Sequence, residues 1–166
     1  MGVPDVIGPG LRVLFCGINP GLVTAATGHQ FARPGNRFWP ALYKSGFTPR
    51  LFRPDEQAEL LSLGLGITNV VERESARADE ITRAEFVAGG EALVTKVVKY
   101  QPKWLAVVGI TAYRDAFGER KAVMGRQDRR IGETQVWILP NPSGLNAHYT
   151  ADTLAAAFAE LRKEVD

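Results

Sequence analysis

Four short apolar runs recur along the chain, separated by segments in which apolar residues are spaced three or four positions apart. A run that is apolar at nearly every position is typical of a strand covered by helices on both faces of a sheet. The predicted strands are residues 11–16, 66–71, 104–108 and 135–139. The wider spacing predicts amphipathic helices between and after these strands.

The predicted helices are bounded by residues that commonly begin and end helices. Pro54 is placed to begin one helix and Gly64 to end it, and its apolar face comprises Ala58, Leu60 and Leu61. Thr82 and Glu85 form a capping box for the next helix, which residues 101–102 end. Its apolar stripe comprises Phe86, Gly90, Leu93, Val94, Val97 and Val98. Residues 36–39 lead into a short predicted helix that ends at about residue 45, and a second short helix is predicted at residues 112–117. The buried stripe of the last predicted helix comprises Leu154, Phe158, Leu161 and Val165.

Four segments lack such a pattern and are predicted to be irregular. Residues 1–10 contain prolines and glycines and form a lead-in. Residues 17–35 form a loop that is long for a compact domain, and loops of this length are usually functional or disordered. Residues 72–80 are charged, and residues 118–133 have the composition of an exposed basic connection. We expect the 17–35 loop to be an ordered part of an active site.

The alternation of strands and helices predicts one α/β domain over residues 1–166, with a mainly parallel central sheet and helices on both faces. A domain of this length buries about 70% of its unfolded surface, so it needs no disulfide or metal to fold. In parallel sheets, ligands bind beyond the carboxyl ends of the strands. Residues 17–21, Asn69 and residues 141–144 follow strand ends, so we expect them to form one shared site.

Composition excludes several classes of protein. Cys16 is the only cysteine and lies in an apolar run, so it is expected in the core, and an internal disulfide or a thiolate-bound cluster is excluded. No basic segment followed by an apolar one begins the chain, and no apolar run approaches about 18 residues. Secretion and membrane insertion are therefore not expected, and a cytoplasmic protein is.

The formal charge of +2 is distributed unevenly along the chain. Residues 1–54 hold six basic residues and one acidic residue, a formal charge of +5, whereas the remainder holds 14 basic and 17 acidic residues, a formal charge of −3. A basic face beside a site is what binding to a phosphate backbone needs. The alternative is an ordinary solvated surface.

Several short motifs occur in a fixed order along the chain. They are residues 9–11 (Pro-Gly-Leu), 17–21 (Gly-Ile-Asn-Pro-Gly), 36–39 (Asn-Arg-Phe-Trp), 66–69 (Gly-Ile-Thr-Asn), 100–102 (Tyr-Gln-Pro) and 141–145 (Asn-Pro-Ser-Gly-Leu). This ordered set resembles the mismatch-specific uracil-DNA glycosylases and the related thymine-DNA glycosylases, one branch of the uracil-DNA glycosylase superfamily. The resemblance implies hydrolysis of the N-glycosidic bond of uracil in DNA, without metal or organic cofactor. The superfamily branch that carries an iron–sulfur cluster is excluded by the single cysteine.

The resemblance also implies roles for individual residues. Asn19 matches the catalytic asparagine, which orients a water toward the sugar C1′ of the flipped nucleotide, since an amide cannot take up the proton. Gly17 and Ile18 belong to the same loop motif, whose backbone would bind the departing base. Phe31 matches the aromatic residue on which the flipped pyrimidine stacks, and Leu145 matches the apolar wedge that intercalates into DNA. The structural alternatives are turn chemistry for Asn19 and core burial for Phe31 and Leu145.

Further residues are implied around the same pocket. Thr24 falls where relatives crowd the 5-position of the pyrimidine, and Asn69 is placed to hydrogen-bond the base or the sugar. Gln30, Asn36 and Arg37 are expected to line the pocket or to meet phosphates. DNA contacts are also expected from Asn141, Ser143, Gly144 and Asn146. Of these, Ser143 and Gly144 would offer backbone N–H groups to a phosphate at a helix start.

Two positions depart from the family pattern. Asp79 lies in the charged segment where relatives have no acid, and we predict that it assists the attacking water; a solvated surface aspartate is the alternative. Relatives commonly have an arginine two residues beyond the wedge, but here that position is Ala147, followed by His148 and Tyr149. Contact with an opposing guanine is therefore left open.

The expected partner is double-stranded DNA that contains uracil mismatches, with single-stranded DNA as a further substrate, and the protein is expected to act as a monomer. Two other functions stay open on the sequence alone. The first is a non-catalytic module that binds damaged DNA, and strand scission at uracil would exclude it. The second is an α/β protein that acts on free nucleotides or phosphates, which activity on free deoxyuridine would support.

Overall fold

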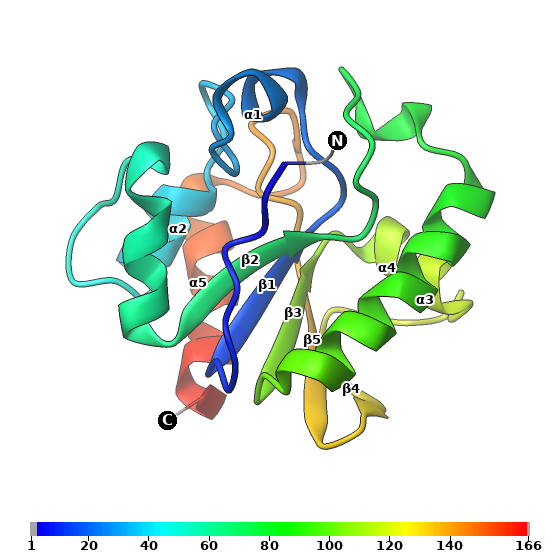
Figure 1. The fold of residues 1–166 in the computed structure, drawn as a ribbon. Helices are drawn as coiled ribbons and strands as arrows, with labels where there is room; N and C mark the ends of the chain where they lie inside the picture. The colour runs from blue at the N-terminus through cyan, green and yellow to red at the C-terminus, as the bar shows by residue number, and fades with distance from the viewer. Residues whose placement is uncertain (1–2, 166) are drawn as a thin grey trace.

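A five-stranded sheet lies at the centre of the fold in the computed structural model, which describes residues 3–165 (Figure 1). The strand order is β2-β1-β3-β5-β4. The four parallel strands are β1 (Val13–Gly17), β2 (Leu65–Asn69), β3 (Trp104–Val108) and β5 (Thr134–Leu139), and β4 (Gly125–Ile131) is antiparallel to β5. Every residue of β1, β2 and β3 is buried, as near-continuous apolar runs predict. The predicted fold class is therefore confirmed.

Helices cover both faces of the sheet (Figure 1). On one face lie α2 (Phe38–Lys44), the 3₁₀ helix η1 (Pro54–Leu63) and α5 (Ala151–Val165). On the other face lie α3 (Arg83–Tyr100) and α4 (Ile110–Phe117). Two short helices, α1 (Leu22–Thr27) and η2 (Ala78–Glu80), belong to the connections after β1 and β2. Within residues 3–165 no helix combines the length and apolar character needed to cross a membrane.

The side chains of β1 pack into two separate cores, because successive side chains of a strand point to opposite faces of the sheet. Val13 and Phe15 belong to the core beneath α2 and α5, whereas Leu14 and Cys16 belong to the core beneath α3 and α4. The thiol of Cys16 is fully buried, and this burial raises its pKa far above the usual value. Cys16 is therefore a core residue, as predicted.

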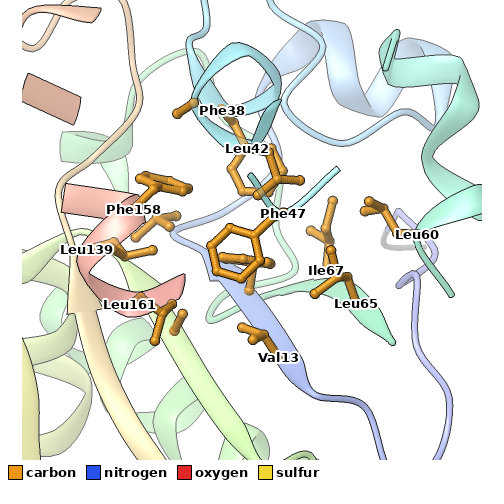
Figure 2. Packing of buried hydrophobic residues seen from close by; sticks show 14 of the residues in the cluster. Val13, Phe38, Leu42, Phe47, Leu60, Leu65, Ile67, Leu139, Phe158 and Leu161 are labelled. Atoms are coloured by element: carbon orange, nitrogen blue, oxygen red, sulfur yellow. The ribbon is translucent and has the colours of Figure 1, made fainter. Parts of the chain in front are cut away.

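The core beneath α2 and α5 is rich in aromatic rings (Figure 2). The ring of Phe15 meets Phe38 edge-on with centroids 5.5 Å apart, meets Phe47 at 5.4 Å and stacks with Phe158 at 6.1 Å. Such pairs stabilise by about 0.5–1.5 kcal/mol each beyond the burial of their area. Phe38 begins α2, so this cluster fixes the start of that helix relative to β1.

The strand β4 was not predicted, because residues 118–133 were interpreted as an exposed connection. Only Ile131 of β4 is fully buried, and the strand lies at the edge of the sheet. The ladder with β5 is irregular between Arg126 and Arg130. An edge strand that buries so little leaves no apolar run to detect, and charged side chains on such an edge discourage pairing with other chains.

The helix α1 was also not predicted within the 17–35 loop. Gly21 precedes it and Gly28 ends it in the left-handed conformation, with φ of 76°. Its first two residues, Leu22 and Val23, are exposed, and of the six residues only Thr24 is buried. The helix therefore shows no apolar stripe that sequence periodicity could reveal.

The boundaries of the two best-defined predicted helices are confirmed, but their buried faces are narrower than predicted. Pro54 begins η1 and Gly64 ends it, although only Leu60 of the predicted apolar face is buried. Thr82 caps α3 by accepting a hydrogen bond from the Glu85 backbone N–H, and the Glu85 carboxylate accepts one from the Thr82 N–H. Of the predicted stripe on α3, Val98 is exposed.

Candidate active site

A cleft opens at the carboxyl ends of β1, β2 and β5, where the sequence predicts the site. It encloses a cavity of about 380 Å³, called the pocket below. Predicted site residues that line the pocket are Ile18, Asn19, Thr24, Phe31, Asn36, Asn69, Asp79, Asn141, Ser143 and Leu145. Gly17, Arg37, Gly144 and Asn146 lie beside it without lining it. The predicted convergence of the three strand ends is therefore confirmed.

Asn19 follows β1, and its side-chain amide is held in one orientation. Its Nδ2 donates to the backbone oxygens of Arg73 at 2.9 Å and Pro20 at 3.3 Å, and to Ser75 Oγ at 2.8 Å. Carbonyl oxygens only accept hydrogen bonds, so the nitrogen must face them and the oxygen must point elsewhere. Asn19 Oδ1 makes no hydrogen bond to residues 3–165. It is therefore available to accept a hydrogen bond from a water.

Ser75, like Arg33, is a residue of the site that the sequence did not reveal. It is buried, its Oγ donates to the backbone oxygen of Arg77 at 2.7 Å, and its backbone N–H donates to Pro20 O at 3.2 Å. A serine in a charged segment gives no periodic signal, so only its position after the Asn69 strand pointed to the site. Ser75 therefore holds Asn19 in two ways, because its Oγ accepts from Asn19 Nδ2 and its N–H fixes the Pro20 carbonyl.

The first turn of α3 anchors the segment that contains Ser75. The Arg73 guanidinium donates to both carboxylate oxygens of Glu85, at 2.7 and 3.1 Å, and to Glu80 O at 2.9 Å. The hydrogen bond from Arg73, followed by that from the Thr82 N–H, lowers the pKa of Glu85 to about 2. Because this pKa is depressed, the pair stabilises the fold at neutral pH and is lost only in acid, as the pH falls from about 4.5 toward 2.

Phe31 and Asn69 approach the end of β1 closely because residue 17 is glycine. A Cβ atom at Gly17 would lie 2.6 Å from Asn69 Oδ1 and 3.3 Å from Phe31 Cζ. The Phe31 ring also stacks on Phe38, with centroids 4.0 Å apart and planes 19° apart. Phe31 is thus partly buried and still lines the pocket, which combines the two alternatives for this residue.

A chain of amide groups fixes the orientation of Asn69. Gln30 Nε2 donates to Pro4 O at 3.3 Å, so Gln30 Oε1 is left to accept from Asn69 Nδ2 at 3.0 Å. Asn69 Oδ1 makes no hydrogen bond within the described part of the chain. Gln30 lines the pocket, which is one of the two roles expected for it. Its side chain is only 2% exposed, so it does not reach the surface where a phosphate would lie.

The remaining residues of the first loop have structural partners. Thr24 Oγ1 accepts from the Ala32 N–H at 3.4 Å, and Asn36 Oδ1 accepts from the Phe38 N–H at 2.9 Å. The backbone oxygens of Gly17 and Ile18 accept from the N–H groups of Val70 and Val71, at 2.9 and 3.0 Å. The absence of a side chain at Gly17 leaves room for Phe31 and Asn69 beside the pocket, and Ile18 lines the pocket wall.

Residues 141–149, called the 141–149 loop below, are held by hydrogen bonds within the loop. The Ser143 N–H donates to Asn141 Oδ1 at 2.9 Å, the Leu145 N–H donates to Ser143 Oγ at 3.2 Å, and Asn146 Nδ2 donates to Asn141 O at 3.0 Å. The prediction of a phosphate site at a helix start is wrong for Ser143, since its N–H is used inside the loop and α5 begins only at Ala151.

Leu145 projects from this loop with 70% of its surface exposed, so its alternative as a core residue is wrong. It lines both the pocket and a second cavity of about 470 Å³, whose other walls include Ile110, Met124 and Tyr149. An exposed leucine between two cavities has the placement that an intercalating side chain requires.

Three charged residues line the pocket at its mouth. Arg33 is exposed and forms no ion pair with residues 3–165. Asp79 lies on η2 and pairs with Arg77, with Arg77 Nε 3.1 Å from Asp79 Oδ1 and both side chains about 70% exposed. Asp79 therefore lines the pocket, as predicted, and its side chain is also exposed to solvent.

In the described part of the chain, no cluster of three His, Cys, Asp or Glu side chains could hold a metal ion.

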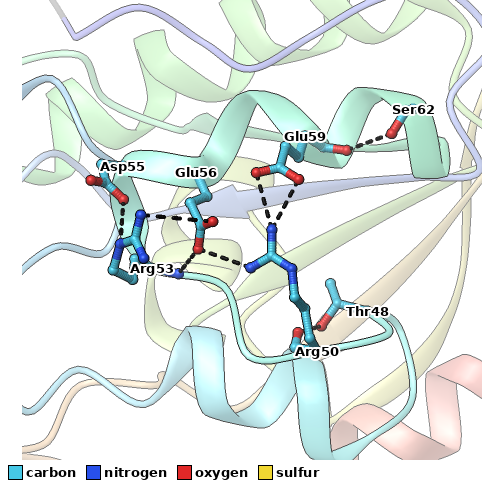
Figure 3. Close-up of polar contacts among 7 residues, drawn as sticks. All are labelled: Thr48, Arg50, Arg53, Asp55, Glu56, Glu59 and Ser62. Atoms are coloured by element: carbon cyan, nitrogen blue, oxygen red, sulfur yellow. Dashed lines mark hydrogen bonds and ion pairs between the residues drawn. The ribbon is translucent and has the colours of Figure 1, made fainter.

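The predicted basic excess of residues 1–54 is partly neutralised in the fold (Figure 3). Arg50 donates to Glu56 and Glu59, and Arg53 donates to Asp55, each at 3.0 or 3.1 Å. The Arg50 hydrogen bond, followed by that from the Arg53 N–H, lowers the pKa of Glu56 to about 2. Asp55, Glu56 and Glu59 lie just after residue 54, so they neutralise arginines of residues 1–54 without being counted in the charge of that segment.

Comparison with known proteins identifies the fold and the family of the chain. A solution NMR structure of a proposed uracil DNA glycosylase from Methanosarcina acetivorans superimposes with a TM-score of 0.61 over 97% of each chain, at 18% sequence identity. At this identity, the superposition shows a shared fold. The family model of the uracil DNA glycosylase superfamily matches residues 4–164. Since this match spans nearly the full sequence, the chain belongs to the uracil DNA glycosylase superfamily.

Proposed function

We propose that this protein flips uracil out of DNA, with the G:U mismatch as its main substrate, and hydrolyses the N-glycosidic bond to leave an abasic site. Membership of the superfamily supports a glycosylase role in general. The observation that carries the finer proposal is the amide of Asn19, which lines the pocket together with the exposed Leu145. Three acceptors fix its nitrogen, and its oxygen makes no hydrogen bond to residues 3–165.

The chemistry follows from what an asparagine can do. Its amide oxygen accepts a hydrogen bond from a water and points one lone pair of that water toward C1′ of the flipped nucleotide, but it does not take up the proton. The C1′–N1 bond breaks with its electron pair on the uracil, and the water oxygen forms the new bond to C1′. The proton lost by the water leaves through solvent or a neighbouring carboxylate.

Asn69 supplies a reason to prefer uracil. Its Nδ2 is committed to Gln30, so it presents Oδ1 as an acceptor. Uracil carries an N–H at its 3-position, whereas cytosine has a bare acceptor nitrogen there. An unpaired acceptor facing an acceptor loses a hydrogen bond in a buried site, which costs about 1–3 kcal/mol. The Phe31 ring, stacked on Phe38, would hold the base from its face.

Asp79 is proposed to assist the attacking water by taking its proton. Its ion pair with Arg77 is exposed, and exposed pairs contribute little, so the carboxylate can exchange partners. Asp79→Asn is expected to lower single-turnover cleavage of uracil about 100-fold, in single-stranded and in mismatched DNA alike, because a general base acts after flipping. Unchanged rates on both substrates would make Asp79 a solvated surface residue.

Arg33 is proposed to contact a phosphate beside the flipped nucleotide, since it is a cation at the mouth of the pocket that forms no ion pair with residues 3–165. Arg33→Gln is expected to weaken binding to duplexes with and without uracil to a similar degree. It should also reduce the slope of log affinity against log salt by about 1. Lys44→Gln is the matched control, because Lys44 is an exposed cation at the end of α2 and away from the pocket. An equal change in slope for both variants would assign the effect to net charge.

The opposing base is a separate question, because the position two residues beyond the wedge is the exposed Ala147. His148 and Tyr149 line the second cavity beside Leu145 and are the side chains available on that side. Rates on uracil opposite guanine, opposite adenine and in single strands compare the mismatch with the alternatives directly. A non-catalytic damage-binding module would bind these DNAs without producing alkali-labile sites.

A further inference from the structure

We infer that Arg37 is a positioning residue that holds the 141–149 loop in the conformation from which Leu145 projects, rather than a residue that contacts DNA. The inference rests on the proposed function, since it assigns the support of the wedge. Arg37 Nη1 donates to Tyr149 O at 2.6 Å, and Nη2 donates to Ser143 O at 2.7 Å and to Asn146 O at 3.1 Å. These three carbonyls bracket Leu145 on both sides.

The backbone reinforces the same contact. The Arg37 N–H donates to Pro142 O at 2.9 Å, so this one residue makes four hydrogen bonds to the 141–149 loop. Gly144 packs on the neighbouring turn, where a Cβ atom would lie 2.6 Å from Gly35 O. The loop is thus seated on residues 35–37 by hydrogen bonds and by close backbone contact.

The side chain must be an arginine for this arrangement. A guanidinium presents donors in a rigid planar fork, so it reaches carbonyls on three different residues at once, whereas a lysine ammonium acts as a single point charge. The fork is oriented by the loop at some cost, because Arg37 Nε is buried and has no hydrogen-bond partner in the described residues. Arg37 also forms no ion pair within residues 3–165, so carbonyl oxygens are the partners that hold it.

Residues 35–37, on which the 141–149 loop packs, are themselves fixed to the core. Arg37 precedes α2, whose first residue Phe38 is fully buried against Phe15 and stacks on Phe31. The wedge and the stacking ring are therefore attached to one rigid element. A wedge held in advance does not have to be ordered when the duplex binds, which favours insertion. Single-stranded DNA has no base stack to open, so its rate of cleavage should depend on Arg37 far less than that of duplex DNA.

The test compares Arg37→Lys, which keeps the charge, with Gly144→Ala, which disturbs the seat without touching the guanidinium. The ratio of single-turnover cleavage rates on G:U duplex and on single-stranded uracil DNA is expected to fall about tenfold in both variants. Thermal unfolding monitors the fold, and Lys44→Gln serves as the control that leaves the ratio unchanged. Equal losses on both substrates would mean a merely structural residue and would overturn the inference.

A second measurement needs no activity and separates this inference from the proposed function. Amide hydrogen exchange of the free protein is expected to quicken at the Leu145 and Asn146 N–H groups in Arg37→Lys, while exchange in β1 and β3 stays as in wild type. Unchanged exchange in the loop would overturn the inference even if the wild type cleaves uracil. Absence of cleavage by the wild type would overturn the proposed function alone.

Discussion

Replacing Asn19 by alanine is expected to lower the rate of uracil cleavage by about 10²–10³-fold while DNA binding stays close to that of the wild type. In the proposed mechanism the Asn19 amide positions the water and makes no contact that binding to the duplex requires. Its Nδ2 donates to Arg73 O, Pro20 O and Ser75 Oγ, so the substitution removes the oriented amide oxygen that is proposed to hold the water. Single-turnover rates on uracil DNA and binding to the same DNA measure the two effects separately.

The control for this substitution is Ser75→Ala. It removes one of the three acceptors that orient Asn19 and leaves the catalytic oxygen in place, so a smaller loss of rate is expected. Asn19→Ala removes three hydrogen bonds of its side chain and Ser75→Ala removes two, each worth about 1 kcal/mol of stability, so thermal unfolding would register the larger shift in Asn19→Ala. If Asn19→Ala lost cleavage and binding equally, Asn19 would be a structural turn residue and the catalytic assignment would fail.

Replacing Leu145 by alanine is expected to lower cleavage of G:U duplex by about 100-fold and to leave single-stranded cleavage nearly unchanged. Opening a base stack costs a few kcal/mol, and an inserted apolar side chain offsets that cost only in duplex DNA. Leu145 is 70% exposed, so its truncation should change the free energy of unfolding by less than about 0.5 kcal/mol. Single-turnover rates on the two DNAs give the ratio that isolates flipping from chemistry.

Leu51→Ala is the matched control for the wedge. Leu51 is also an exposed leucine, at 54%, and it lies between α2 and η1, away from the pocket. Its truncation should change neither rate. A parallel loss on duplex and single-stranded DNA in Leu145→Ala would show that the leucine shapes the pocket instead of opening the helix.

The parts of the fold that the sequence predicted are those where burial leaves a pattern. The strands β1, β2 and β3 are buried at every position, so their apolar runs are continuous. The capping box at Thr82 is a local arrangement, which four residues suffice to specify. By contrast, β4 buries little and α1 exposes Leu22 and Val23, so neither produced a periodic signal.

The candidate site divides in the same way. Asn19, Asn69 and Leu145 were predictable because each belongs to a motif at a strand end, and parallel strands bring their carboxyl ends together. The role of Arg37 was not predictable, because a guanidinium in a loop has the same sequence signal whether it meets phosphates or carbonyls. Ser75 was missed because its partner, Asn19, lies 56 residues away in the chain.

The central claim is that the pocket cuts the bond to uracil rather than only binding the flipped base. The most direct measurement incubates the wild type with a duplex that carries a single G:U pair, and then quantifies released uracil and alkali-labile strand breaks. The account predicts one free uracil for each break at that position, with no break in a G:C control duplex and a large loss in Asn19→Ala. Tight binding of the G:U duplex without released uracil or breaks would contradict it.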